Sequence, residues 1–132
     1  MFKNFAEKNY SGFYVVFRIL VGLLFLQHGA QKLFGAFGGL GGNAVPLISL
    51  MGLAGIIEFF GGLFIVLGLL TRYVAAIAAI EMLVAYFMAH IPQGIIPILN
   101  QGEPALLFFA SSLILISQGS KKFALDNLFK KK

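Results

Sequence analysis

Six ionisable side chains stand inside long apolar stretches of this sequence: Arg18, His28, Lys32, Glu58, Glu81 and His90. A charged side chain at the centre of a bilayer costs roughly 3 kcal/mol or more on insertion scales, so such residues usually have partners and a function. Carboxylates and imidazoles exchange protons, and imidazoles and ammonium groups donate hydrogen bonds to ligand oxygens. The sequence therefore predicts a polar site enclosed by apolar helices.

The composition indicates a membrane protein, because 59% of the 132 residues are apolar and only 11% are charged. Such a chain cannot cover itself with a solvated surface. Its length allows one small domain, residues 1–132, without a separate soluble catalytic module. The chain has no cysteine, which excludes disulfides, thiol catalysis, iron–sulfur clusters and zinc–thiolate sites. We therefore expect no metal site.

Four apolar runs predict an all-α fold, a bundle of four transmembrane helices. The expected helices cover residues of about 13–34, 47–70, 72–91 and 104–119. Pro104 suits the first position of the last helix, and Glu103 suits the positive end of its dipole. That last run is somewhat short for a full crossing, since a span needs ~20 residues.

The positions of lysine and arginine predict the orientation. They precede the first helix, occur at Arg72 between the second and third helices, and gather after the fourth, whereas the other two connections lack them apart from Lys32. Both termini are therefore expected in the cytoplasm of a prokaryotic cell whose plasma membrane the chain crosses several times. A cleaved signal peptide is disfavoured, because the first run is too long and contains Arg18. The basic residues are juxtamembrane and fit contact with anionic lipids, not with nucleic acid.

Depth along the expected helices divides the polar residues into two layers. Glu58 and Glu81 fall near the middle of their helices, and Arg18 lies about 8 Å to the cytoplasmic side, within reach of its long side chain. We therefore predict an intramembrane cluster of Arg18, Glu58 and Glu81, in which the guanidinium prevents repulsion between two carboxylates. Two interpretations stay open: a structural polar clamp, and a glutamate that exchanges a proton with a substrate or an ion path.

The outer half of the expected bundle holds His28, Lys32, His90 and Glu103, which we predict to bind a ligand. Histidine and lysine would donate to the carbonyl oxygens of a quinone whose ring lies against aromatic side chains. The alternative, two axial histidine ligands to a haem, is disfavoured because the histidines differ by roughly 6 Å in height. We expect no other cofactor.

Two connections are unusual in composition. The glycine-rich segment 35–43 has no preceding strand and no following Gly-Lys-Ser/Thr, so it is an outer turn and not a phosphate-binding loop. The segment 92–102 contains several isoleucines and two prolines. It is either a lid over the outer mouth of the bundle or an ordinary interfacial connector.

Two spaced patterns together resemble the DoxX family of small four-helix membrane proteins: Arg18-x3-Gly22-x5-His28-Gly29-x2-Lys32-Leu33 and Glu58-x2-Gly61-Gly62-x5-Gly68-x2-Thr71-Arg72. His90, Glu103, Gly119 and Leu125-Asp126 extend the resemblance over nearly the whole chain. One departure lies in the closing motif, where this chain has Lys121 and Ala124 in place of the family's usual glycine and serine.

The resemblance implies a plasma-membrane protein tied to redox chemistry, since relatives include a subunit of an archaeal thiosulfate:quinone oxidoreductase. The chain itself carries no flavin, nicotinamide or haem-attachment motif, so it cannot move electrons alone. We therefore expect a quinone- or lipophile-binding subunit associated with a membrane or soluble oxidoreductase. The alternative is a non-enzymatic scaffold or carrier with a structural polar core. A transporter would require a homo-oligomer, which the glycine-lined helix faces would permit.

Overall fold

A computed structural model describes residues 1–129 and contains only helices as regular elements within that range. The four long helices are α1 (Phe2–Phe34), α2 (Leu50–Leu67), α3 (Thr71–Ala85) and α5 (Glu103–Gln118). The short elements are 3₁₀ turns η1 (Ala36–Gly38) and η3 (Ile91–Gln93), the π-helical turn η2 (Tyr86–His90), and helices α4 (Pro97–Asn100) and α6 (Asp126–Phe129). The expectation of an all-helical fold is confirmed for this part of the chain.

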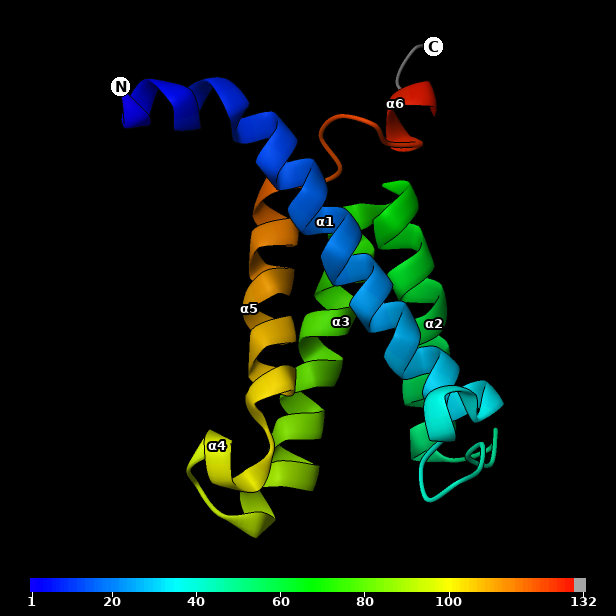
Figure 1. Cartoon of the computed structure of the whole chain (residues 1–132). Helices are drawn as coiled ribbons and strands as arrows, with labels where there is room; N and C mark the ends of the chain where they lie inside the picture. Colours follow the sequence, from blue (N-terminus) through cyan, green and yellow to red (C-terminus); the bar gives the residue numbers. More distant parts are fainter. Residues whose placement is uncertain (130–132) are drawn as a thin grey trace.

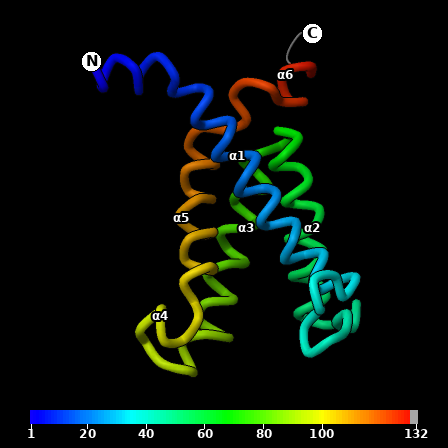
Figure 2. The backbone as a smooth tube through the Cα atoms, in the orientation of Figure 1, coloured from blue at the N-terminus to red at the C-terminus, as the bar shows by residue number. Residues whose placement is uncertain are grey.

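The bundle consists of two closely packed helix pairs. Helix α1 packs along α2, and α3 packs along α5, while α2 and α3 join the pairs (Figure 1). The backbone trace in Figure 2 shows that the chain runs down, up, down and up through these helices. Both ends of the described chain lie at one end of the bundle, called here the terminal end. The connections 35–49 and 86–102 form the opposite, loop end.

Apolar side chains pack into two clusters inside the bundle. The cluster nearer the loop end joins Phe25 of α1 to Met82 and Tyr86 and to Ala105 of α5. The cluster nearer the terminal end consists of Tyr14, Ile65, Ala75 and Leu115. Large apolar side chains also face outward, including Leu53 at 53% exposure and Ile80 at 65%. An outward apolar surface of this kind suits hydrocarbon and not water.

Local signals explain where the helices begin and end. Ser49 accepts a hydrogen bond from the Gly52 amide at 2.9 Å and so caps the start of α2, three residues later than expected. Gly68 ends α2 with a left-handed φ of 66°. Helix α1 begins at Phe2 and not near residue 13, because its first three turns form an exposed amphipathic extension with a Lys3–Glu7 pair one turn apart.

Three helical stretches are long and apolar enough to cross a membrane: Phe2–Phe34, Leu50–Leu67 and Thr71–Gln93. Helix α5 has 16 residues, a length of about 24 Å against ~30 Å of hydrocarbon. Because α5 is shorter than the hydrocarbon layer, a fourth membrane-spanning helix stays a prediction. The π-helical turn lets the third stretch continue past Ala85 as far as Gln93.

Glycines allow α1 and α2 to approach each other closely. A Cβ atom on Gly29 would collide with the backbone of Phe59, and one on Gly62 would collide with the backbone of Leu26. Small residues at such crossings let the backbones pack closely, and this packing is one of the forces that associate helices in membranes, where there is no hydrophobic driving force between helices.

We expect Gly29→Ala to force α1 and α2 apart and to destabilise the protein by about 1–3 kcal/mol. Thermal unfolding in a mild detergent measures this loss. Gly12→Ala is the matched control, because a Cβ at Gly12 meets nothing within 4 Å in the same helix. Equal unfolding temperatures for the two variants would contradict the proposed close contact.

Candidate functional site

A cavity of about 420 Å³ lies at the loop end between the two helix pairs and is called here the loop-end pocket. Its polar lining comes from α1, α2, the π-helical turn and the residue after α4: His28, Gln31, Lys32, Glu58, His90 and Gln101. Its apolar lining consists of Leu40, Met51, Met82, Ala85, Ala89, Pro104, Ala105 and Phe108. Apolar walls with a few convergent polar groups are typical of sites for small molecules.

A buried ion pair forms part of the pocket wall. The Lys32 ammonium lies 2.5 Å from a Glu58 carboxylate oxygen, and the two side chains are 12% and 5% exposed. The pair connects α1 to α2 where glycines bring these helices together. Glu81 interacts electrostatically with both members. The pair neutralises two charges that would each be costly alone in an apolar interior.

The two histidines stand on different sides of the pocket. The His28 ring contacts Phe108 edge to face, with ring centroids 5.5 Å apart. His90 Nδ1 lies 2.9 Å from the carbonyl oxygen of Asn100. Because a carbonyl only accepts, that nitrogen carries the hydrogen, and Nε2 of a neutral His90 ring is then an acceptor. The pocket therefore offers a hydrogen-bond acceptor at His90 as well as the Lys32 ammonium.

Asn100 organises the connection beside the pocket and was missed by the sequence analysis. Its side chain is fully buried, donates to the Gly94 carbonyl at 2.6 Å and accepts from the Gly102 amide at 2.8 Å. These bonds close the segment 94–102 on itself and present the Asn100 carbonyl to His90. The only local signal was an amide residue directly before Gln101-Gly102, which is too common to single out.

Arg18 occupies a different site at the terminal end. It is fully buried, and its guanidinium donates to the carbonyl oxygens of Ser120, Lys122, Phe123 and Val66. The predicted pairing of Arg18 with Glu58 and Glu81 is therefore wrong, and the cation beside these glutamates is Lys32. The side chain of Arg18 lies at the terminal end because residues 119–129, the C-terminal segment, fold back against the end of α2 and supply carbonyl acceptors there.

Glu81 is not among the described lining residues of the loop-end pocket. It lines a separate apolar cavity of about 260 Å³ formed mainly by α2 and α3. Both of its carboxyl oxygens are buried, and neither has a hydrogen-bond partner among residues 1–129.

Glu103 is exposed in the first turn of α5, and the described lining of the loop-end pocket does not include it. The structure thus places His28, Lys32 and His90 together, with Glu58 and without Glu103.

The family model described as DoxX matches residues 13–91, more than half of the chain. The chain belongs to the DoxX family. It is also similar to an uncharacterized protein of Haemophilus influenzae, with 38% identity over 133 aligned residues that cover 98% of this chain and 99% of the relative. No solved structure matches the chain.

Membership in the DoxX family, together with the long apolar helices, makes this chain a membrane protein. The matched region of the DoxX protein includes the Lys32–Glu58 pair, Arg18, Glu81 and both histidines. Residues 1–129 contain no group of three histidine, aspartate or glutamate side chains that could hold a metal ion.

Proposed function

We propose that this DoxX-family protein is a multi-pass protein of a bacterial plasma membrane that binds a quinone or a similar lipophile in the loop-end pocket. In this proposal it acts as a subunit or accessory protein of a membrane oxidoreductase. The observation that carries the proposal is the buried Lys32–Glu58 pair on the wall of a 420 Å³ cavity that His28 and His90 also line.

The pocket chemistry suits a flat ring with polar oxygens at its edge. The Lys32 ammonium has three donor hydrogens, of which Glu58 uses only part, and His28 supplies an imidazole. Quinone carbonyl oxygens accept hydrogen bonds from such groups. A quinol hydroxyl would donate to Glu58 or to Nε2 of His90. Phe108 and the methionines Met51 and Met82 would pack against the ring.

The position of the pocket also supports a ligand that arrives from the bilayer. The pocket lies between helices whose outer faces are apolar, and the exposed isoleucines of segment 92–102 stand at the same end of the bundle. In the proposed topology α5 is the fourth span and both termini are cytoplasmic, because lysine and arginine concentrate at the terminal end. The pocket then opens toward the outer half of the membrane.

An oxidoreductase partner is part of the proposal because the chain has no cysteine and no cofactor motif of its own. Reducing a quinone takes two electrons and two protons. The electrons would come from the partner's cofactors, and Glu58, which lines the pocket, would lie in a position to pass protons. The DoxX subunit would hold and orient the quinone and exclude bulk water from it.

We expect a short-chain ubiquinone to raise the unfolding temperature of the purified protein by about 3 °C or more at saturating concentration. Glu58→Gln should remove most of this shift, because the Lys32 ammonium then loses the carboxylate that holds it on the pocket wall. Glu81→Gln is the matched control, since it changes a buried glutamate that lines a different cavity. Differential scanning fluorimetry in mild detergent measures both. A quinone shift that is absent from the native protein, or lost equally in both variants, would refute quinone binding in this pocket.

A scaffold role is the second candidate, and the close mutual contact of Lys32 and Glu58 favours it. With 2.5 Å between the Lys32 ammonium and a Glu58 oxygen, each charge is neutralised by the other, so the pair can fix the α1–α2 contact without any ligand. This role predicts that Glu58→Gln, if it folds, still pulls down the native partner in full amount. The scaffold would be excluded as the main role if the native protein binds quinone and the Glu58→Gln variant lowers the oxidoreductase activity of the complex.

A further inference from the structure

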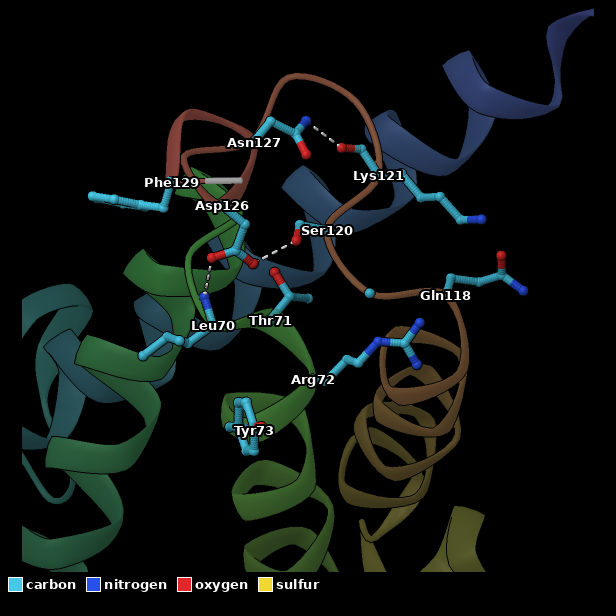
Figure 3. A pocket seen from close by; sticks show the side chains of 11 residues that line it. Leu70, Thr71, Arg72, Tyr73, Gln118, Ser120, Lys121, Asp126, Asn127 and Phe129 are labelled. Carbon is cyan, nitrogen blue, oxygen red and sulfur yellow. Dashed lines mark hydrogen bonds between the residues drawn. The ribbon is translucent and has the colours of Figure 1, made fainter. Parts of the chain in front are cut away.

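We propose a second binding site, for a phosphate group, at the terminal end of the bundle. A cavity of about 560 Å³ lies there between the start of α3, the end of α5 and the C-terminal segment (Figure 3). It is separated from the loop-end pocket by the length of the helices, so the proposal does not rest on quinone binding. The ligand is a phosphate monoester or diester, carried by an anionic lipid headgroup or by a soluble metabolite.

The N-terminus of α3 supplies the first attraction for an anion. Thr71 and Arg72 are the first residues of this 15-residue helix and both line the cavity. The first amides of a helix have no partner within the helix, and the helix dipole places a partial positive charge at this end. Phosphate groups bind at such positions in many proteins.

A buried hydroxyl provides the second, independent observation. Thr71 is 1% exposed, and its Oγ1 atom has no hydrogen-bond partner within residues 1–129. Figure 3 shows this oxygen directed toward the side of the cavity where Ser120 and Asp126 lie. A buried hydroxyl without a partner costs about 1–3 kcal/mol. An oxygen atom of a ligand that accepts from this hydroxyl would recover that energy.

Two cations flank the same cavity. Arg72 and Lys121 both line it, and Figure 3 shows them on the side of the cavity that also carries Gln118. The Arg72 guanidinium donates through one of its nitrogens to the Ile116 carbonyl at 2.5 Å, which holds it near the end of α5. A planar guanidinium with an ammonium nearby is a typical combination for phosphate recognition.

Asp126 is the one carboxylate among the described lining residues, and both of its oxygens have partners. One accepts from the Leu70 amide at 2.9 Å, and the other accepts from the Ser120 hydroxyl at 2.5 Å. Asp126 therefore connects the C-terminal segment to the α2–α3 turn and shapes the wall of the cavity. The described lining residues carry two positive charges, Arg72 and Lys121, against this one negative charge, which favours an anion.

The site can be tested with the full-length protein in a neutral detergent. We expect phosphatidylglycerol added to the micelles to raise the unfolding temperature by about 4 °C or more, whereas zwitterionic phosphatidylcholine does not. Arg72→Gln and Lys121→Gln should each lose at least half of this shift, and Thr71→Val should reduce it. Lys122→Gln is the matched control, because its side chain carries the same charge next to Lys121 but does not line the cavity.

Glycerol 3-phosphate distinguishes the two sources of the phosphate group. A shift with glycerol 3-phosphate, lost in Lys121→Gln but not in Lys122→Gln, assigns the site to a soluble phosphorylated molecule. A shift with phosphatidylglycerol alone assigns it to a lipid headgroup. No shift with either compound, or an equal loss in Lys121→Gln and Lys122→Gln, overturns the proposal. Lys121 is exposed, so its variant will fold and the test remains decisive if Arg72→Gln does not.

Discussion

Replacing Arg18 by methionine is expected to detach the C-terminal segment from the bundle. The guanidinium donates to four backbone carbonyls, three of them in residues 120–123. Hydrogen bonds to a charged group contribute roughly 1.5–3 kcal/mol each, so losing several should destabilise this region by about 3 kcal/mol or more. Trypsin should then cut after Lys121 and Lys122 about a hundredfold faster, because the open form is populated more often in proportion to the lost stability. The cleavage rate is followed by mass spectrometry of the intact protein.

Two further variants check this result. Arg18→Lys should give an intermediate cleavage rate, because one ammonium cannot replace a planar guanidinium that donates to several carbonyl oxygens at once. Lys8→Met is the matched control, since it removes an exposed cation from the same helix. A native cleavage rate in Arg18→Met would contradict the assignment of Arg18 to the C-terminal segment.

Breaking the Lys32–Glu58 pair one residue at a time is expected to destabilise the protein more than removing both charges. Lys32→Met or Glu58→Gln should each cost about 3–5 kcal/mol, because each leaves a charge without its partner in an interior where the two side chains are 12% and 5% exposed. The double variant Lys32→Met/Glu58→Gln should recover most of this loss. Thermal unfolding of the four proteins gives the coupling energy directly.

The outcome of this cycle also bears on function. A coupling energy near zero would mean that the pair does not hold α1 against α2. Strong coupling with a stable double variant would provide a folded protein whose pocket lacks the pair. Quinone should then fail to stabilise that double variant if the polar wall is what binds it, whereas the Glu81→Gln control should still respond.

The helices were predictable because the signals that define them are local. The run 104–119 predicted α5 to within one residue at each end, since Gly102, Glu103 and Pro104 mark its start and Gly119 its end. The first helix was predicted to start too late, because residues 2–12 are amphipathic and do not form a continuous apolar run. Ser49, which caps the start of α2, is also a local signal.

The partners of the charged residues could not be predicted in the same way. Depth along straight helices placed Arg18 within reach of Glu58 and Glu81, and it took no account of the backbone of residues 120–123 and of Val66. Every residue has a backbone carbonyl, so nothing in the sequence identifies the four that accept hydrogen bonds from Arg18. Depth also placed Lys32 with the outer ligand-binding residues and not with Glu58, whereas the crossing of α1 and α2 brings the two side chains into contact.

By itself, the sequence determined the membrane character, the helical class, the family and the set of polar residues that require partners. These properties follow from composition, from hydrogen bonds within each helix and from the spacing of a few residues. Only the tertiary structure decided that Lys32 neutralises Glu58, that Arg18 binds the C-terminal segment and that two histidines share a cavity with the ion pair. Such pairings depend on how helices cross and where the chain returns, and many distant contacts together determine that geometry.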